Sequence, residues 1–143
     1  MSKILYSLLN IARCGGQYRK RLLEPWGLNS RQASLLLEIC ATPGISQDTL
    51  SRRVFLDKSV VARLLAGLEE LGYVDRPVSQ KDRRVNCLHP TQKALQLQPQ
   101  LQAIWTDCEK FLTEGMTKEE VATLETILDR LQARAEKWVE GEV

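Results

Sequence analysis

Two short amphipathic segments joined by a tight turn, and followed by a basic turn between two β-rich stretches, limit the fold of this chain more than any other feature. They lie between Ser46 and Arg84. Ser46 is an N-cap candidate for the first segment, and Asp48 lies where it can interact with the positive end of a helix dipole. After a break at Phe55, Asp57 is the N-cap candidate of the second segment. The sequence thus predicts a helix, a short turn and a second helix.

The two predicted helices have distinct faces. The first has a narrow apolar stripe: Ile45, Leu50 and Val54. The second has apolar residues at three- and four-residue spacing, which predict a core face: Val61, Leu64, Leu65, Leu68 and Leu71. The residues on its opposite face are polar or have small side chains: Lys58, Ser59, Ala62, Arg63, Ala66 and Gly67. Because glycine inside a helix costs about 1 kcal/mol relative to alanine, we expect a packing or close-approach reason for Gly67.

A basic hairpin is predicted after the second helix, which Gly72 ends. Tyr73 to Val78 and Arg84 to Leu88 are rich in β-forming residues, and they flank the turn-prone segment Ser79 to Arg83. Four cations and one anion lie between Arg76 and Arg84. Such a tip can enter a minor groove, where the negative potential attracts arginine, although these charges could also belong to an ordinary solvated loop.

A helix-turn-helix followed by a hairpin is typical of a winged helix. The predicted fold class is therefore mainly α with a small β-hairpin wing (α+β). The commonest use of this module is to lay one helix in a DNA groove.

Length and composition favour one compact domain. A chain of 143 residues with 43% hydrophobic residues is long enough for one core. The apolar run from Ile4 to Leu9 is too brief for a secretory signal, and no segment reaches the roughly 20 apolar residues of a membrane span. We therefore expect a cytoplasmic protein that does not enter a membrane.

The charge is unevenly distributed along the chain. Residues 1–112 carry a net charge of +6, whereas residues 113–143 carry −4. A polyanionic partner is expected to meet the first part and avoid the C-terminal helix, although acidic helices are also simply soluble ones.

The two ends of the chain are predicted to form helices with apolar stripes. Thr117 and Glu120 form a capping box at the start of the C-terminal helix. Its stripe consists of Val121, Leu124, Leu128, Leu131, Ala135 and Trp138. The N-terminal stripe consists of Leu5, Leu8, Leu9, Ala12, Leu22 and Leu23. Gly15-Gly16 interrupts it and indicates a bend or a close helix crossing. Both stripes could pack on the chain's own core or against a second subunit.

In combination, these segments resemble the MarR family of bacterial transcription regulators. The resemblance lies in Asp57 to Val74 (DKSVVARLLAGLEELGYV), in the D-x-R arrangement of Asp82 and Arg84, and in Leu28 to Gln32. It covers nearly the whole chain and implies one MarR-type domain over residues 1–143. Within it, residues 29–90 would form the winged-helix DNA-binding lobe, and residues 1–25 and 91–143 would form N- and C-terminal dimerisation helices.

The same resemblance implies a homodimer on a pseudo-palindromic, double-stranded DNA operator. Arg84 would enter the minor groove and Asp82 would orient the wing tip. The family usually has Leu-Thr-x-x-Gly after the wing, whereas this chain has Pro90 to Ala94, so only the start of the next helix at Thr91 carries over.

Specific roles follow for the predicted DNA contacts. The residues expected to read base edges lie on the second helix: Lys58, Ser59, Val60 and Arg63. A good bidentate contact with a base is worth about 1–3 kcal/mol. Phosphate contacts that position the protein are expected from Ser46, Gln47 and Lys81. The remaining hairpin residues of the predicted interface are Arg76, Asp82, Arg83 and Arg84.

Family members commonly bind small aromatic or anionic molecules between the dimerisation layer and the DNA-binding lobe. By this resemblance the protein would be a repressor released by such an effector. Candidate effector-binding residues are Arg13, Tyr18, Trp26, Trp105 and Cys108, although each alone is more typical of an ordinary core or surface residue. Pro99 predicts that the helix from Thr91 to Leu112 is kinked or divided near Gln98.

Cysteine spacing does not predict a metal site. Cys14, Cys40, Cys87 and Cys108 form no C-x-x-C pair, and the chain has one histidine. Reduced thiols packed as small apolar groups are the default expectation, which suits Cys40. Cys14 is the redox candidate, because nearby cations can favour a thiolate, and a cysteine-based redox-sensing regulator of the same fold is an alternative function.

No catalytic residues or cofactors are predicted. His89 stands alone without a nucleophile pattern, and there is no Gly-rich phosphate loop or paired acidic motif. A second alternative is a winged helix that binds protein, which would need an apolar recognition face. Lys58, Ser59 and Arg63 do not form such a face.

Overall fold

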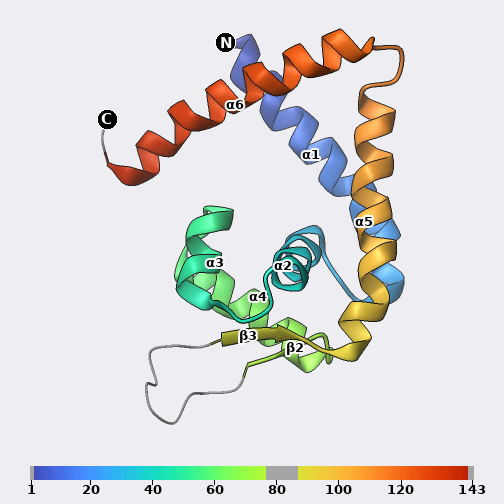
Figure 1. The fold of residues 1–143 in the computed structure, drawn as a ribbon, viewed down its shortest axis with the longest axis vertical. Helices are drawn as coiled ribbons and strands as arrows, with labels where there is room; N and C mark the ends of the chain where they lie inside the picture. Colours follow the sequence, from blue (N-terminus) through green and yellow to red (C-terminus); the bar gives the residue numbers. More distant parts are fainter. Residues whose placement is uncertain (1, 77–86, 142–143) are drawn as a thin grey trace. The chain divides into compact units, whose positions relative to one another are not determined.

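The computed structural model describes residues 2–76 and 87–141. They fall into two compact units, Met1–Thr106 and Asp107–Val143. The first unit contains α1 (Lys3–Leu23), the 3₁₀-helix η1 (Glu24–Trp26), α2 (Ser30–Ala41), β1 (Ile45–Ser46), α3 (Gln47–Val54), α4 (Lys58–Glu70), β2 (Val74–Asp75), β3 (Cys87–Pro90) and most of α5 (Gln92–Leu112) (Figure 1). The second unit contains the end of α5 and all of α6 (Lys118–Glu140).

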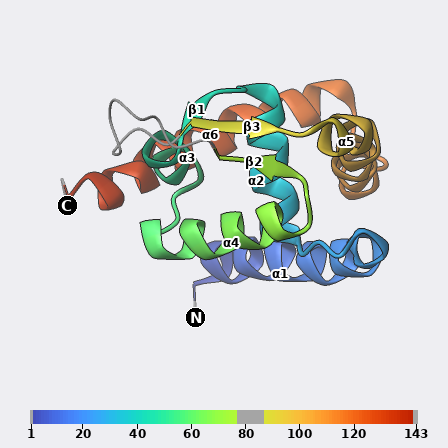
Figure 2. The same ribbon diagram turned by 90° about the horizontal axis from the view of Figure 1, so that it is seen from below.

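The structure confirms the predicted fold class and adds a strand. The three strands are antiparallel in the order β1-β3-β2, so β3 lies in the middle of the sheet (Figure 2). Ile45 pairs with Leu88, and Val74 pairs with Pro90. The sequence predicted a hairpin alone. It missed β1 because a two-residue strand is too short to show the alternation by which strands are recognised.

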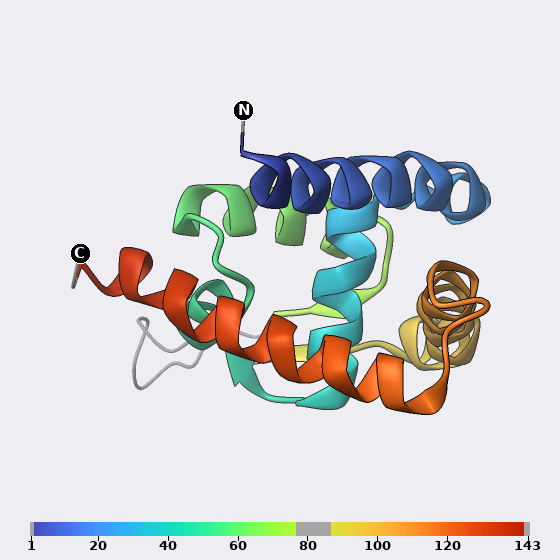
Figure 3. The same ribbon diagram turned by 90° about the horizontal axis from the view of Figure 1, so that it is seen from above.

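The core of the first unit is built around α2, which packs against α1, α3, α4 and β3 (Figure 3). The largest fully buried side chains come from all of these elements and from α5: Leu23, Leu35, Leu36, Ile39, Leu50, Val61, Leu65, Leu68, Leu88 and Leu101. Val61, Leu65 and Leu68 belong to the predicted core face of α4, which is therefore confirmed.

Local capping explains where several helices begin and end. Asn29 and Gln32 form a reciprocal capping box at α2, and Thr117 and Glu120 form the predicted one at α6. Gly72, which follows α4, has a φ of 81°, in the left-handed region that glycine tolerates.

Of the two outcomes predicted at Pro99, a kinked or a divided helix, division is wrong, because α5 runs continuously through it, and the kink stays a prediction. Proline removes one backbone hydrogen bond and costs about 3 kcal/mol or more in a helix interior. Ala94, Leu97 and Leu101 lie on both sides of Pro99 and are buried in the core of the first unit. We infer that this burial holds the helix together despite the proline.

Gly15-Gly16 does not break α1 either. The helix is continuous from Lys3 to Leu23, and a Cβ added at Gly16 would meet nothing within 4 Å. The atoms nearest to a Cβ added at Gly15 belong to the Arg19 side chain, four residues along the same helix. Within the described residues, then, neither glycine marks a close helix crossing.

Candidate nucleic-acid interface

The first helix of the helix-turn-helix is fixed at its start by Ser46. The Ser46 hydroxyl accepts a hydrogen bond from the Thr49 backbone N–H at 3.1 Å and donates one to Thr49 Oγ1 at 2.9 Å. Ser46 is thus the N-cap of α3, as predicted, and Asp48 lies in the first turn. Gln47, the other predicted phosphate contact on this helix, is the first residue of α3.

The turn between α3 and α4 contains a backbone outlier at Phe55. Its φ is 56° and its ψ is 40°, in the left-handed region, and its side chain is 48% exposed. Asp57 follows at the N-cap position of α4, as predicted, but its side chain makes no capping hydrogen bond.

The N-terminal end of α4 exposes most of the residues predicted to read bases. Lys58, Ser59 and Arg63 are exposed, and Val60 is half-buried. Lys58 Nζ lies 3.3 Å from Asp48 Oδ1, and both side chains are largely exposed, so this ion pair contributes little to stability. The buried face of α4 fixes the helix, and this polar face is left open to a partner.

Gly67 does not belong to that open face, contrary to the sequence-based expectation. A Cβ at Gly67 would lie 2.6 Å from Gln32 Nε2, which is closer than real Cβ atoms approach. The same Gln32 side chain accepts a hydrogen bond from Asn29 N–H at 3.1 Å within the α2 capping box. The expected packing reason for Gly67 therefore exists, and the surface that approaches it is α2.

Arg76 lies at the base of the predicted wing and contacts two helices. Its Nε is 2.7 Å from Glu69 Oε1 on α4, and its Nη1 donates to Gln47 Oε1 on α3 at 3.0 Å. The other four hairpin residues of the predicted interface, Lys81, Asp82, Arg83 and Arg84, lie outside the described residues.

The candidate effector residues have different surroundings. The Trp26 carbonyl accepts a hydrogen bond from Tyr73 Oη at 3.1 Å, and Trp26, Tyr73 and Lys93 help to line a hollow of about 210 Å³. Arg13 and Tyr18 are exposed on α1, and Cys108 belongs to the second unit.

Trp105 lies against a residue that the sequence did not single out. The guanidinium carbon of Arg19 is 5.3 Å from the centre of the Trp105 ring, and Arg19 Nε donates to Ser30 Oγ at 3.0 Å. This arrangement links α1, α2 and α5 within the first unit. One arginine among several on α1 gives no sequence signal of such a contact.

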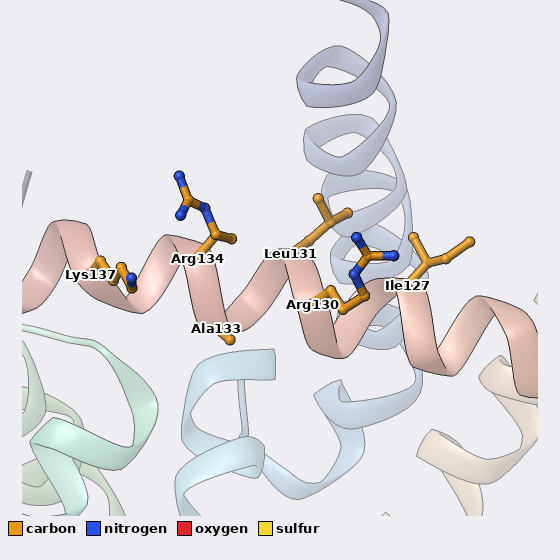
Figure 4. A pocket seen from close by; sticks show the side chains of 6 residues that line it. All are labelled: Ile127, Arg130, Leu131, Ala133, Arg134 and Lys137. Carbon is orange, nitrogen blue, oxygen red and sulfur yellow. The ribbon is translucent and has the colours of Figure 1, made fainter.

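A shallow hollow runs along α6 in the second unit (Figure 4). Its lining residues are Ile127, Arg130, Leu131, Ala133, Arg134 and Lys137. All six belong to one helix, so the hollow is an open surface rather than an enclosed pocket. It places three cations beside exposed apolar side chains.

The four cysteines differ in how far their side chains are buried. Cys40 is buried, as expected, and its burial raises the pKa of the thiol. Cys14 is exposed, and Cys87 and Cys108 are half-buried.

Across residues 2–76 and 87–141, His, Cys, Asp and Glu side chains form no group that could hold a metal ion. In the same two ranges no helix has the length and apolarity to cross a membrane.

Comparisons with known proteins find similarity to transcription regulators. A model described as the MarR family matches residues 26–85. The curated relative YybA of Bacillus subtilis, an uncharacterized HTH-type transcriptional regulator, is 26% identical over 137 residues, which span 96% of this chain and 91% of YybA.

Solved structures share the fold over almost the entire chain. The transcriptional regulator SlyA has a TM-score of 0.95 at 21% identity, covering 99% of this chain and 100% of SlyA. A MarR family regulator from Listeria monocytogenes, solved with a 26mer DNA, has a TM-score of 0.91 at 23% identity, covering 99% of this chain and 95% of that one.

Proposed function

Since the chain belongs to the MarR family of winged helix-turn-helix transcription regulators, we propose that it is a sequence-specific regulator that binds double-stranded DNA. The observation that carries this proposal is the N-terminal end of α4. Lys58, Ser59 and Arg63 are exposed there, on a helix whose other face is buried. Exposed cationic and hydroxyl donors on a rigid helix suit base edges and phosphates in a major groove.

A homodimer on a pseudo-palindromic operator is part of the proposal. Large apolar side chains are exposed along α1: Ile4, Leu5, Tyr6, Leu8, Leu9 and Ile11. Others are exposed along α6: Ile127, Leu128, Leu131, Trp138 and Val139. Apolar surface of this extent is a reason to expect a protein partner. A two-fold dimer would present two α4 helices, which could enter successive major grooves if they lie about 34 Å apart.

Repression in the cytoplasm, relieved by a small aromatic or anionic effector, completes the proposal. Arg13, Tyr18, Trp26, Trp105 and Cys108 stay the candidate effector residues. The Arg19 guanidinium supports an anionic effector near Trp105, because within the described residues it has no carboxylate partner. A peptide-binding winged helix is disfavoured by the polar, exposed face of α4.

The test is DNA selection followed by titration. Duplexes that wild-type protein enriches from a random-sequence library would be titrated, beside random duplex, at several salt concentrations. Arg63→Ala should lower discrimination between the two duplexes by about 1–3 kcal/mol. Lys81→Ala should weaken both duplexes similarly and reduce the steepness of the salt dependence by about one unit. Equal losses from both substitutions would refute this division of roles, and failure to enrich any sequence would refute the function.

A further inference from the structure

Arg76 ties the base of the hairpin to both helices of the helix-turn-helix. It follows β2 directly, and its guanidinium uses two different nitrogens for two different partners. Nε lies 2.7 Å from Glu69 Oε1 near the end of α4, and Nη1 donates to Gln47 Oε1 at the start of α3, 3.0 Å away. The guanidinium is planar, so contacts through two of its nitrogens fix its orientation. A single contact would not fix it.

This arrangement is partly sheltered from water. The side chain of Arg76 is 26% exposed and that of Glu69 is 35% exposed. Glu69 Oε1 itself is buried and accepts no well-aligned hydrogen bond from the described residues, so the nearby guanidinium is what compensates its charge there. Removing one partner of such a pair leaves a charge without compensation, which costs more than breaking an exposed ion pair.

The contact also orients Gln47. A side-chain amide has one acceptor oxygen and one donor nitrogen on opposite sides. Arg76 engages the oxygen, which turns the NH₂ group away from the guanidinium and leaves it able to donate. A donor at the first residue of α3 is what a phosphate contact by Gln47 needs.

We propose that Arg76 is a positioning residue of the DNA interface, which acts through Gln47 and Glu69 and does not itself bind phosphate. The inference rests on the proposed function. Arg76 sets the amide of Gln47 for phosphate and holds the hairpin base at a fixed place beside α3 and α4. Its charge is compensated by Glu69, so it contributes little to the attraction of the polyanion.

A positioning role for Arg76 and a direct contact between Arg76 and phosphate predict opposite results for two substitutions. Arg76→Lys keeps the charge, which preserves a phosphate contact, but a lysine cannot reach two partners with fixed geometry. Glu69→Gln removes an anion beside the interface. If Arg76 bound phosphate, freeing it in this way would strengthen DNA binding; if Arg76 is a positioning residue, the same change weakens binding.

The experiment measures the affinity of the full chain for a duplex selected by wild-type protein, over a range of salt concentrations. Binding should be weakened about tenfold by each of three substitutions: Arg76→Lys, Glu69→Gln and Gln47→Ala. Arg76→Ala should also weaken binding about tenfold, without changing the slope of log affinity against log salt. Arg76→Ala combined with Gln47→Ala should be no weaker than Arg76→Ala alone, because both act through one contact. Lys81→Ala, at the cation proposed to contact phosphate, is the control and should reduce the slope by about 0.9.

Thermal unfolding of each variant, with binding measured well below the transition, separates positioning from loss of the fold. If Arg76→Ala does not fold, Arg76→Lys and Glu69→Gln still decide. Wild-type affinity in Arg76→Lys, tighter binding by Glu69→Gln, or a slope lowered by Arg76→Ala would each overturn the inference. These outcomes require a wild-type protein that selects DNA, so they differ from failure of the proposed function, in which the wild type selects none.

Discussion

Phe55 shows how a single backbone angle shapes the helix-turn-helix. Phe55, with a φ of 56°, ends α3 and belongs to the turn that precedes α4 at Lys58. A residue with a Cβ in this region is strained by about 1–2 kcal/mol, whereas glycine is not. The half-exposed ring therefore occupies a position where the backbone would favour glycine.

The strain can be measured by comparing two substitutions at this residue. Both Phe55→Gly and Phe55→Ala remove the ring, but alanine keeps the strained angle. We expect the glycine variant to have the larger free energy of unfolding, by about 1 kcal/mol, which reverses the usual order of alanine and glycine. Urea denaturation at one protein concentration gives both values. An alanine variant as stable as the glycine variant would show that the turn is not strained.

At the scale of elements, the contact between α2 and α4 depends on Gly67 and Gln32. Alanine at position 67 gains about 1 kcal/mol of helix propensity, but its Cβ would displace the Gln32 amide from the α2 capping box. We expect Gly67→Ala alone to change stability little, because the gain and the loss offset each other. In a Gln32→Ala background the same substitution should stabilise by about 1 kcal/mol.

A double-mutant cycle of these four proteins in urea tests the contact. The combined effect of Gly67→Ala and Gln32→Ala on the free energy of unfolding should differ from the sum of their separate effects by about 1 kcal/mol. Additivity between positions 32 and 67 would mean that Gln32 moves aside at no cost.

Elements with local signals could be predicted from the sequence. The Ser46 cap, the Thr117 and Glu120 box, and the glycine at position 72 are set by neighbours within a few residues. Features decided by distant residues could not. The continuity of α5 through Pro99 depends on burial of Leu97 and Leu101, and the side of α4 on which Gly67 lies depends on Gln32.

The same distinction applies to the candidate site. Exposure of Lys58, Ser59 and Arg63 followed from the apolar spacing of α4, which fixes its buried face. The partners of Arg76 lie 7 and 29 residues earlier in the chain, so no local pattern indicated that its guanidinium is engaged.

For the whole molecule, the proposed dimer is the property on which DNA binding depends most. Leu131 is 41% exposed on the apolar stripe of α6, and Ala122 is exposed elsewhere on the same helix. Leu131→Glu should produce a monomer, because it places a charge in an apolar interface. Losing the second half-site should then weaken binding to a selected duplex by about a hundredfold or more.

Ala122→Glu adds the same charge to the same helix and is the control, which should stay dimeric. Sedimentation velocity gives the oligomeric state, and titration of the selected duplex gives the affinity. A wild-type protein that sediments as a monomer, or a Leu131→Glu variant that binds as tightly as wild type, would contradict the dimer proposal.

The central place of β3 in the sheet has a consequence for how the protein assembles. β3 joins residues 87–90 to β1 at 45–46, and the Leu88 carbonyl accepts a hydrogen bond from Gly44 N–H at 2.8 Å. Helices form from neighbours and nucleate quickly, whereas these partners must meet across a long intervening stretch of chain, at a cost in loop-closure entropy. We therefore expect the helices to fold first and the sheet to close in a late step that completes the domain.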